Sequence, residues 1–185
     1  PAIVEKYMDK VNAKIGTDYK LFNYYGAPDA EQVIIAMGSG CETIEETIRV
    51  LERKGERVGL VKVRLYRPWV SERLREVMPK TAKRIAVLDR TKEPGAPGGP
   101  LYLDVVSAFS GKDTNDAEEM KPVIVGGRYG LGSKDTTPGQ ILAVYENLKQ
   151  DDPKNGFTIG IEDDVSGSSL PFREFTAEPE GTMRC

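Results

Sequence analysis

Three apolar segments alternate with two helical segments in the middle of the chain, and no other feature constrains the fold as strongly. The apolar segments lie at 33–37, 58–65 and 84–89, and the first is an uninterrupted Val-Ile-Ile-Ala-Met. Such a run is typical of a strand that is covered on both faces. Because parallel strands need a crossover between them, usually a helix, this alternation predicts two consecutive βαβ units.

The flanking segments add further elements to this centre. We expect a short strand or extended lead-in at 19–25 and strands at 122–127 and 157–161. The spacing of apolar residues predicts helices at 3–15, 42–54, 71–78, 101–109 and 137–148. Gly16 should end the first helix, Ser71 should cap the third, and Thr137 should cap the last, ahead of Pro138.

The predicted fold is therefore a three-layer α/β/α domain with a mostly parallel sheet of about five strands. We expect this domain to span 19–165, after a leading helix or linker at 1–18 that belongs to a preceding domain. The polar residues at 111–119 predict a loop or a frayed turn. The polar sequence from Glu162 onward predicts a connector rather than core, so we expect 166–185 to form a linker and the start of a next domain. The chain begins at Pro1 without a methionine and stops at Cys185 with no element completed, so we expect an excerpt of a longer protein.

Composition excludes several classes of function. The 185 residues are 39% hydrophobic and 30% charged, a balance typical of globular proteins, and no apolar run approaches the roughly 20 residues of a membrane-spanning helix. The absence of histidine excludes Ser-His-Asp, Cys-His and His-metal sites built from this chain alone. Two cysteines cannot form the thiolate cage of an iron–sulfur cluster or a structural zinc site, and so few fit a reducing cytoplasm. The net charge of −3 argues against nucleic acid or an anionic membrane as a main partner.

Gly38, Ser39 and Gly40 follow the first buried strand and begin a helix, which is the geometry of a phosphate-binding turn. The dinucleotide fingerprint needs a third glycine where this chain has Thr43, and no Gly-Lys-Ser/Thr sequence follows. A tight strand-to-helix turn is therefore the favoured interpretation, with a phosphate site as the alternative. Cys41 at the same helix start is interpreted as a small packing residue rather than a nucleophile.

Two charged or glycine-rich segments follow other strands, at the sheet edge where ligands of α/β proteins bind. Residues 89–95, which include Lys92, have the charges either to hold a substrate or to dock on a neighbouring domain, and docking is slightly favoured. Residues 126–134 contain four glycines, and Arg128 and Lys134 could contact an anion or a partner surface. We predict no catalytic residue and no metal ligand. The candidates for a strand-end anion site or interdomain surface are Gly38, Ser39, Gly40, Lys92, Arg128 and Lys134.

Long motifs along the whole chain resemble the second domain of pyruvate:ferredoxin (flavodoxin) oxidoreductases, the thiamine-dependent 2-oxoacid oxidoreductases. They are GAPDAE at 26–31, MGSGCET at 37–43, GLVKVRLYRP at 59–68, DRTKEPG at 89–95, GPLYLDV at 99–105, GRYGLGSK at 127–134, IEDDV at 161–165 and SLP at 169–171. The last residues, 176–185, resemble the opening of the third domain of these enzymes.

The resemblance implies a fold like the carboxy-terminal domain of transketolase, in a homodimeric enzyme that converts pyruvate and coenzyme A to acetyl-CoA and CO2 (pyruvate synthase). Such enzymes pass electrons to ferredoxin or flavodoxin and use thiamine diphosphate, Mg²⁺ and [4Fe-4S] clusters. The family's thiamine, coenzyme A and cluster motifs lie in other domains. This chain is therefore expected to bind no cofactor, to be inactive alone, and to support the other domains of the same polypeptide.

Three alternatives stay open. One is a stand-alone, Rossmann-like nucleotide-binding domain, which would bind NAD or another nucleotide in calorimetry. A second is a plain interaction module, which would be recognised by self-association. The third is the same domain from an oxidoreductase of a different 2-oxoacid, such as 2-oxoglutarate or a branched-chain acid, although the closeness of the match favours pyruvate.

Overall fold

A computed structural model of the chain describes residues 1–110, 121–162 and 164–175, and the statements below concern these residues. The helices are α1 (Ala2–Ile15), α2 (Gly40–Arg53), α3 (Ser71–Val77), α4 (Pro100–Ser110) and α5 (Pro138–Lys149), with a short 3-10 turn η1 (Leu131–Ser133). The strands are β1 (Phe22–Gly26), β2 (Gln32–Ala36), β3 (Val58–Val63), β4 (Arg84–Asp89), β5 (Val123–Arg128) and β6 (Phe157–Thr158). The expected loop at 111–119 and the expected domain start at 176–185 lie outside the described residues.

The six strands form one sheet in the order β1-β3-β2-β4-β5-β6. β1 is antiparallel to β3, and all the other neighbouring strands are parallel. The mostly parallel sheet predicted from the alternating pattern is thus confirmed. It has six strands rather than about five because the lead-in segment pairs as β1 and a two-residue β6 extends the opposite edge.

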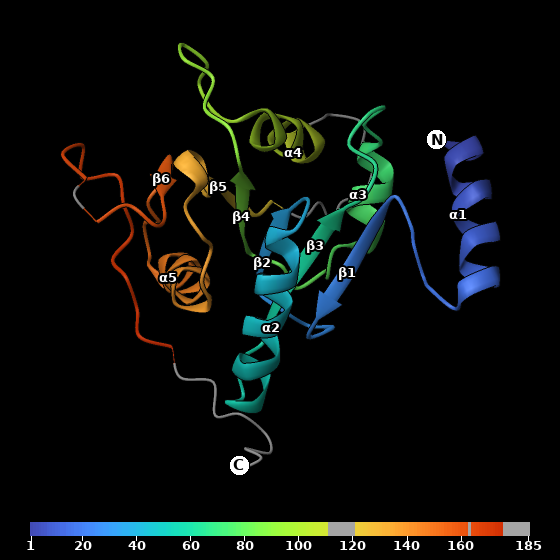
Figure 1. The fold of residues 1–185 in the computed structure, drawn as a ribbon, viewed down its shortest axis with the longest axis horizontal. Helices are drawn as coiled ribbons and strands as arrows, with labels where there is room; N and C mark the ends of the chain where they lie inside the picture. The colour runs from blue at the N-terminus through green and yellow to red at the C-terminus, as the bar shows by residue number, and fades with distance from the viewer. Residues whose placement is uncertain (111–120, 163, 176–185) are drawn as a thin grey trace.

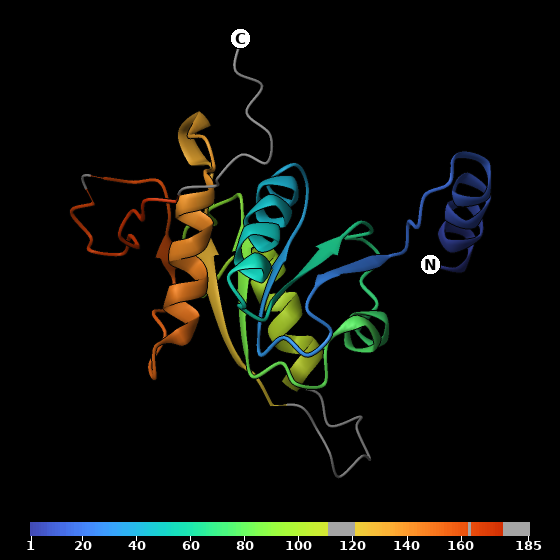
Figure 2. The ribbon, with the colours of Figure 1, turned by 90° about the horizontal axis from the view of Figure 1, so that it is seen from below.

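The helices form a layer on each face of the sheet (Figures 1 and 2). α2 and α5 pack over one face, and α3 and α4 pack over the other. Apolar side chains of β2, β3 and β4 alternate between the two cores; for example, Ile34 points to the α2–α5 side and Ile35 to the α3–α4 side. Burial on both faces explains the uninterrupted apolar run of β2, and it confirms the three-layer α/β/α fold.

The connection from β5 to β6 has the opposite hand to the three crossovers before it. The chain passes from β2 to β3 in one direction across the sheet, with α2 on one face. It passes from β3 to β4 and from β4 to β5 in the other direction, with α3 and α4 on the other face, so these three crossovers have the same hand. It continues in that direction from β5 to β6, but α5 lies on the face of α2. A reversed crossover is rare. Here it places α5 against α2 and closes the core on that face.

Three predicted boundaries differ from the observed ones. β3 ends at Val63, because the N–H groups of Arg64 and Leu65 turn back to donate to Leu21 O. Ser71 is the first residue of α3 instead of its cap, since its Oγ accepts a hydrogen bond from Trp69 Nε1 (3.1 Å). β6 is shorter than expected, since Gly160 has a φ of 80° and bends the chain away from the sheet.

The segment after Glu162 is more than the expected connector. Leu170 and Phe175 pack against the core between α2, α5 and the sheet. The backbone N–H of Leu170 also donates to Thr158 O (2.9 Å), beside a parallel bridge between Thr158 and Ser169. The polar composition of this segment concealed its two apolar anchors, which lie five residues apart without a strand or helix period.

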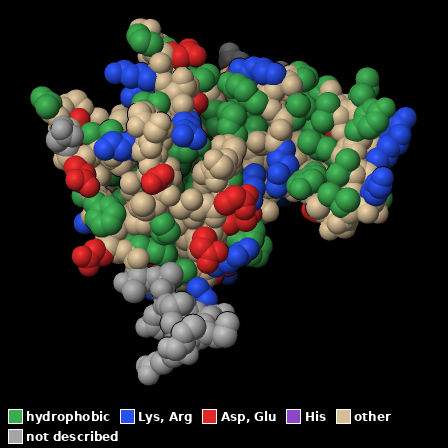
Figure 3. Space-filling model, viewed as in Figure 1, with side chains coloured by type: hydrophobic (Ala, Val, Ile, Leu, Met, Phe, Trp, Pro, Cys, Tyr) green, Lys and Arg blue, Asp and Glu red, His purple; other side chains and the backbone are tan. Residues whose placement is uncertain are grey.

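α1 stands apart from the sheet, beyond β1 (Figure 1). It ends, as predicted, at Gly16, whose φ of 72° and N–H donated to Asn12 O (2.8 Å) form the helix cap. Val4 and Met8 pack towards the domain, but no residue of α1 is buried. An apolar stripe on this helix is exposed in Figure 3, with exposed fractions of 74%, 60%, 42% and 61% for Ile3, Tyr7, Val11 and Ile15. Within the described residues, no helix combines the length and apolar character needed to cross a bilayer.

Candidate functional site

The strand order reverses direction between β2 and β4, and this position is the topological switch point of the sheet. The chain leaves β2 towards β3 on one side, and it leaves β4 towards β5 on the other. The two helix-forming connections therefore diverge above the carboxyl ends of β2 and β4. In open α/β sheets this is the place where ligands bind.

A cleft of about 360 Å³ lies at this switch point. Its apolar walls come from the ends of four strands and the start of α4: Met37, Tyr66, Leu88, Pro100 and Tyr129. Its polar groups include Ser39, Arg90 and Thr91. Of the residues predicted from the sequence, the structure brings Gly38 and Ser39 to this cleft, while Lys92, Arg128 and Lys134 do not line it.

The turn that begins α2 has a structural explanation for both of its glycines. Gly38 has a φ of 77°, and a Cβ on Gly40 would lie 2.8 Å from the ring of Tyr129. The Tyr129 hydroxyl in turn donates to Met37 O (3.1 Å). The N–H groups of Cys41 and Glu42 donate to carbonyls within the turn, each at 3.1 Å. These contacts explain the Gly-Ser-Gly sequence as a tight turn against which the ring of Tyr129 packs.

Asp89, the last residue of β4, holds the start of α4. Its side chain is buried, and its two carboxylate oxygens accept hydrogen bonds from the N–H groups of Leu101 (3.0 Å) and Tyr102 (3.1 Å). Burial raises the pKa of Asp89, while these two N–H groups and the charge of Arg128 lower it. A Cβ on Gly99 would overlap the carboxylate. Asp89 therefore caps α4 from a distance and is not available to grip a substrate.

Sequence reasoning missed this role of Asp89, although a signal was present. The segment Gly98-Gly99-Pro100 begins a helix without Ser, Thr, Asp or Asn in the N-cap position. A buried helix start without its own cap needs an acceptor from elsewhere. Asp89 is the acid at the end of the preceding strand.

Arg128 lies next to Asp89 on the neighbouring strand, since the two residues are paired in the register of β4 and β5. It lines a second, smaller cavity of about 100 Å³, together with Tyr102, Asn155 and Asp89. Asp89 borders both cavities, so they adjoin at the end of β4. Lys92 and Lys134 are exposed beyond the same two strands. The six predicted residues therefore form two groups, one at the turn before α2 and one around the ends of β4 and β5.

Cys41 is buried on α2, which confirms its interpretation as a packing residue. Burial is the main cause that raises its pKa to about 11, and the carboxylates of Glu42 and Glu45 add to this effect. Lys62 opposes it, but the Lys62 ammonium is already paired with Glu42 (2.9 Å) and Glu45 (2.6 Å). In the described ranges, no group of three or more His, Cys, Asp or Glu side chains lies close enough to hold a metal ion.

A pKa of about 11 predicts that native Cys41 reacts slowly with thiol reagents. At pH 8 about one Cys41 side chain in a thousand would be a thiolate, against about a quarter for an ordinary thiol with a pKa near 8.5. In a Cys185→Ser variant, labelling by iodoacetamide should therefore be at least a hundredfold slower in buffer than in 6 M guanidinium chloride. Equal rates in the two solutions would contradict the burial of Cys41.

The comparisons with known proteins match this chain to one family. The family model described as "Pyruvate:ferredoxin oxidoreductase core domain II" matches residues 30–141. This range contains β2 to β5 and most of the residues that line the two cavities. The chain belongs to this family. The resemblance inferred from the motifs is therefore confirmed.

Two curated relatives show how much of a longer protein the chain represents. It is 51% identical over its full length to the pyruvate-flavodoxin oxidoreductase of Enterobacter agglomerans, of which it covers 15%. It is 52% identical over its full length to the pyruvate:ferredoxin oxidoreductase of Moorella thermoacetica, again covering 15%. The chain thus spans about 15% of the length of these relatives.

A solved structure supports the fold. The 2-oxoglutarate:ferredoxin oxidoreductase of Magnetococcus marinus superposes with a TM-score of 0.53 and 20% sequence identity over 80% of this chain and 23% of that one. At this identity the likeness shows the fold alone. The mostly parallel sheet of this chain agrees with the fold that the resemblance implied, that of the carboxy-terminal domain of transketolase.

Proposed function

We propose that the chain is an internal, non-catalytic domain of an enzyme that converts pyruvate and coenzyme A to acetyl-CoA and CO2. Two electrons would pass from each pyruvate to ferredoxin or flavodoxin. The observation that carries this proposal is the 51–52% identity over the whole chain to enzymes named for pyruvate and for these carriers. A different 2-oxoacid is the second candidate, since the Magnetococcus enzyme, with 2-oxoglutarate, coenzyme A and succinyl-CoA bound, has the same fold.

The residues that the structure describes offer no cluster or diphosphate site of the kind that such an enzyme uses. An iron–sulfur cluster is held by several cysteine thiolates, usually four. Cys41 has a raised pKa, and in the described residues it lies in no group of three or more possible ligands. At the turn before α2, the N–H groups of Cys41 and Glu42 already donate within the turn, and the Glu42 carboxylate would repel a diphosphate there. We therefore propose that thiamine diphosphate, Mg²⁺, the [4Fe-4S] clusters and coenzyme A are bound by other domains.

The proposed role of this domain is to support its neighbours. The exposed apolar stripe of α1 is the kind of surface that proteins cover with a partner. We propose that other domains of the same polypeptide, or the second subunit of a homodimer, cover it in a cytoplasmic enzyme. Because α1 stands apart, the division into 1–18, 19–165 and 166–185 is proposed with α1 as the link to a preceding domain.

An assay of the full-length protein tests the proposed reaction. Purified without oxygen, it should reduce ferredoxin or flavodoxin when pyruvate and coenzyme A are both present, and should form one acetyl-CoA for each CO2. With 2-oxoglutarate or a branched-chain 2-oxoacid the ratio kcat/KM should be at least tenfold lower. A preference for another 2-oxoacid would favour the second candidate, and turnover by the 185-residue chain alone would contradict the non-catalytic role.

The exposed lysines at the strand ends provide a more local prediction. If the ends of β4 and β5 face the substrate or coenzyme entrance or a neighbouring domain, Lys92→Ala with Lys134→Ala should raise a KM about tenfold or weaken dimerisation to a similar degree. Lys80→Ala is the matched control, because Lys80 is exposed and precedes β4, at the end of this strand opposite to the proposed surface. Steady-state kinetics and analytical ultracentrifugation measure both effects. If the double variant has the KM values and the dimerisation of wild type, this surface contacts neither the entrance nor a neighbouring domain.

A further inference from the structure

Arg128 differs from every other arginine that the structure describes. The side chains of the others each have a hydrogen bond, an ion pair or another polar contact. Some pair with an acid, as Arg57 does with Asp29. Others donate to a backbone carbonyl, as Arg84 does to Leu148 O (2.7 Å) and Arg90 does to Gly130 O (3.3 Å). The Nε of Arg128 is buried without a hydrogen-bond partner. Buried polar groups in native proteins are almost always paired. An unpaired buried N–H on a guanidinium therefore points to an acceptor that binds there.

The cavity beside Arg128 has room for a small acceptor group. Its volume of about 100 Å³ exceeds the roughly 30 Å³ that one water molecule occupies in the liquid. Half of the residues that line it are glycines, at 98–99, 126–127 and 156, so much of the wall is backbone. A Cβ on Gly126 would lie 3.0 Å from the ring of Tyr102, so this wall has no space for a side chain. The cavity is thus small, and its polar character comes from few groups.

Tyr102 supplies a second donor in the same cavity. Its hydroxyl oxygen accepts a hydrogen bond from Asn155 Nδ2 (3.4 Å). The amide oxygen of Asn155 is itself fixed by the N–H groups of Gly126 (2.8 Å) and Gly156 (2.9 Å), so the amide is held in one orientation. The hydroxyl proton of Tyr102 has no acceptor in the described residues. Arg128 and Tyr102 are therefore two donors that both lack acceptors.

Asp89 is the one carboxylate among the cavity walls, and it does not satisfy these donors. Both of its oxygens accept N–H groups of α4. It lies beside Arg128 in register and balances part of the guanidinium charge, which lowers the pKa of Asp89 against the effect of burial. The charge of Asp104 also acts on Asp89, but Asp104 is paired with Arg67 (2.8 Å). Arg90, Lys92 and Lys134 add positive charge beyond the same strands, partly offset by Glu93 and Asp135. The surroundings thus favour an acceptor that carries negative charge.

We propose that this cavity, named here the Arg128 pocket, binds one oxyanion group no larger than phosphate. The planar guanidinium presents its Nε and an Nη in a fork that matches two oxygens of a carboxylate or phosphate. The Tyr102 hydroxyl donates to one of these oxygens. The oxyanion is supplied either by a free small anion or by an acidic side chain of another domain. This site is independent of the reaction proposed for the whole enzyme.

Hydrogen exchange with mass spectrometry on the full-length protein tests this site locally. Inorganic phosphate and acetate are titrated at constant ionic strength, and exchange is followed in peptides that cover 97–105 and 123–130. For a free anion, wild type gains protection in these peptides with phosphate or acetate. Arg128→Gln weakens the apparent affinity at least tenfold, Tyr102→Phe weakens it less, and the Lys80→Ala control binds as wild type does.

For a carboxylate from another domain, the peptides of wild type are protected without added anion. Arg128→Gln then loses that protection together with a second segment outside this chain. The proposal is overturned if wild type and Arg128→Gln exchange alike under all conditions. It is also overturned if Arg128→Lys behaves fully as wild type, because a lysine can balance the charge of Asp89 but cannot form the fork. Should Arg128→Gln fail to fold, Tyr102→Phe decides, and an unchanged affinity in that variant counts against the site.

Discussion

Asp89→Ala is expected to lower the free energy of unfolding of the chain by about 3 kcal/mol, and thereby the Tm by roughly 6–12 °C. The substitution removes the acceptor of the buried N–H group of Leu101 and of the partly buried N–H group of Tyr102, at the start of α4. Each unsatisfied buried donor costs about 1–3 kcal/mol. It also leaves Arg128 without the carboxylate that balances its charge. Urea unfolding followed by circular dichroism measures the loss.

Two variants separate the capping role of Asp89 from general effects of removing an acid. Asp89→Asn keeps one acceptor oxygen but turns an NH2 group towards the second backbone N–H, so about half of the loss is expected. Glu93→Ala removes an exposed acid four residues later and should change the free energy of unfolding by less than about 0.5 kcal/mol. If Asp89→Ala is as stable as Glu93→Ala, the carboxylate does not hold α4.

The elements that sequence reasoning predicted well are those whose signal is local. The run Val-Ile-Ile-Ala-Met predicted a buried central strand because burial on both faces leaves no polar position in β2. Thr137 and Pro138 predicted the start of α5, where the Thr137 side chain accepts the N–H of Gln140 and completes a capping box. Gly16 ended α1 for an equally local reason.

What could not be predicted depends on contacts between distant segments. β1 pairs antiparallel with β3, and nothing within 22–26 specifies that partner. The anchors Leu170 and Phe175 lie in a polar segment without periodicity, so only the fold shows that they reach the core. The reversed crossover that brings α5 to the face of α2 contradicts a general rule and has no sequence signature.

The candidate site follows the same division. The turn at Gly38 to Gly40 was placed correctly after β2, because a strand, a glycine-rich turn and a helix follow one another in the sequence. The pairing of Arg128 with Asp89 needs the register of β4 and β5, which apolar strands do not specify. Lys92 and Lys134 were candidates for an anion site or an interdomain surface at other strand ends, and neither lines the cleft beside the turn.

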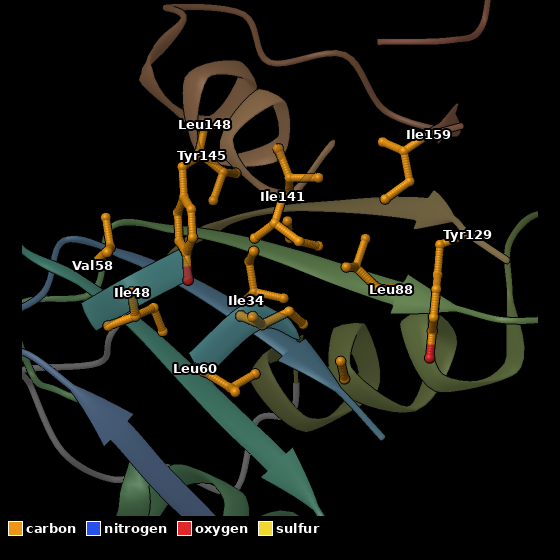
Figure 4. Close-up of a cluster of buried hydrophobic side chains, with 14 of the residues drawn as sticks. Ile34, Ile48, Val58, Leu60, Leu88, Tyr129, Ile141, Tyr145, Leu148 and Ile159 are labelled. Carbon is orange, nitrogen blue, oxygen red and sulfur yellow. The ribbon is translucent and has the colours of Figure 1, made fainter. Parts of the chain in front are cut away.

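Tyr145→Ala is expected to lower the free energy of unfolding by about 4 kcal/mol, the typical cost of removing a buried aromatic side chain. Tyr145 is fully buried, and its ring reaches from α5 towards Val58 of β3 and Ile48 of α2 (Figure 4). Its hydroxyl donates to Gly59 O on β3 (3.0 Å), and burial raises its pKa well above the usual value. The side chain therefore ties α5 to a strand beyond β2 and fills the space between α5 and α2.

Tyr145→Phe isolates the hydroxyl from the ring in the same position. It leaves the Gly59 carbonyl without this donor and should cost about 1 kcal/mol, so that roughly three quarters of the alanine effect belongs to the ring. Because α5 packs on α2, the cavity in Tyr145→Ala should also speed hydrogen exchange in α2, from Gly40 to Arg53, more than in α4 on the opposite face. Equal acceleration of α2 and α4, or a loss below about 2 kcal/mol in Tyr145→Ala, would mean that the two layers are not held through this side chain.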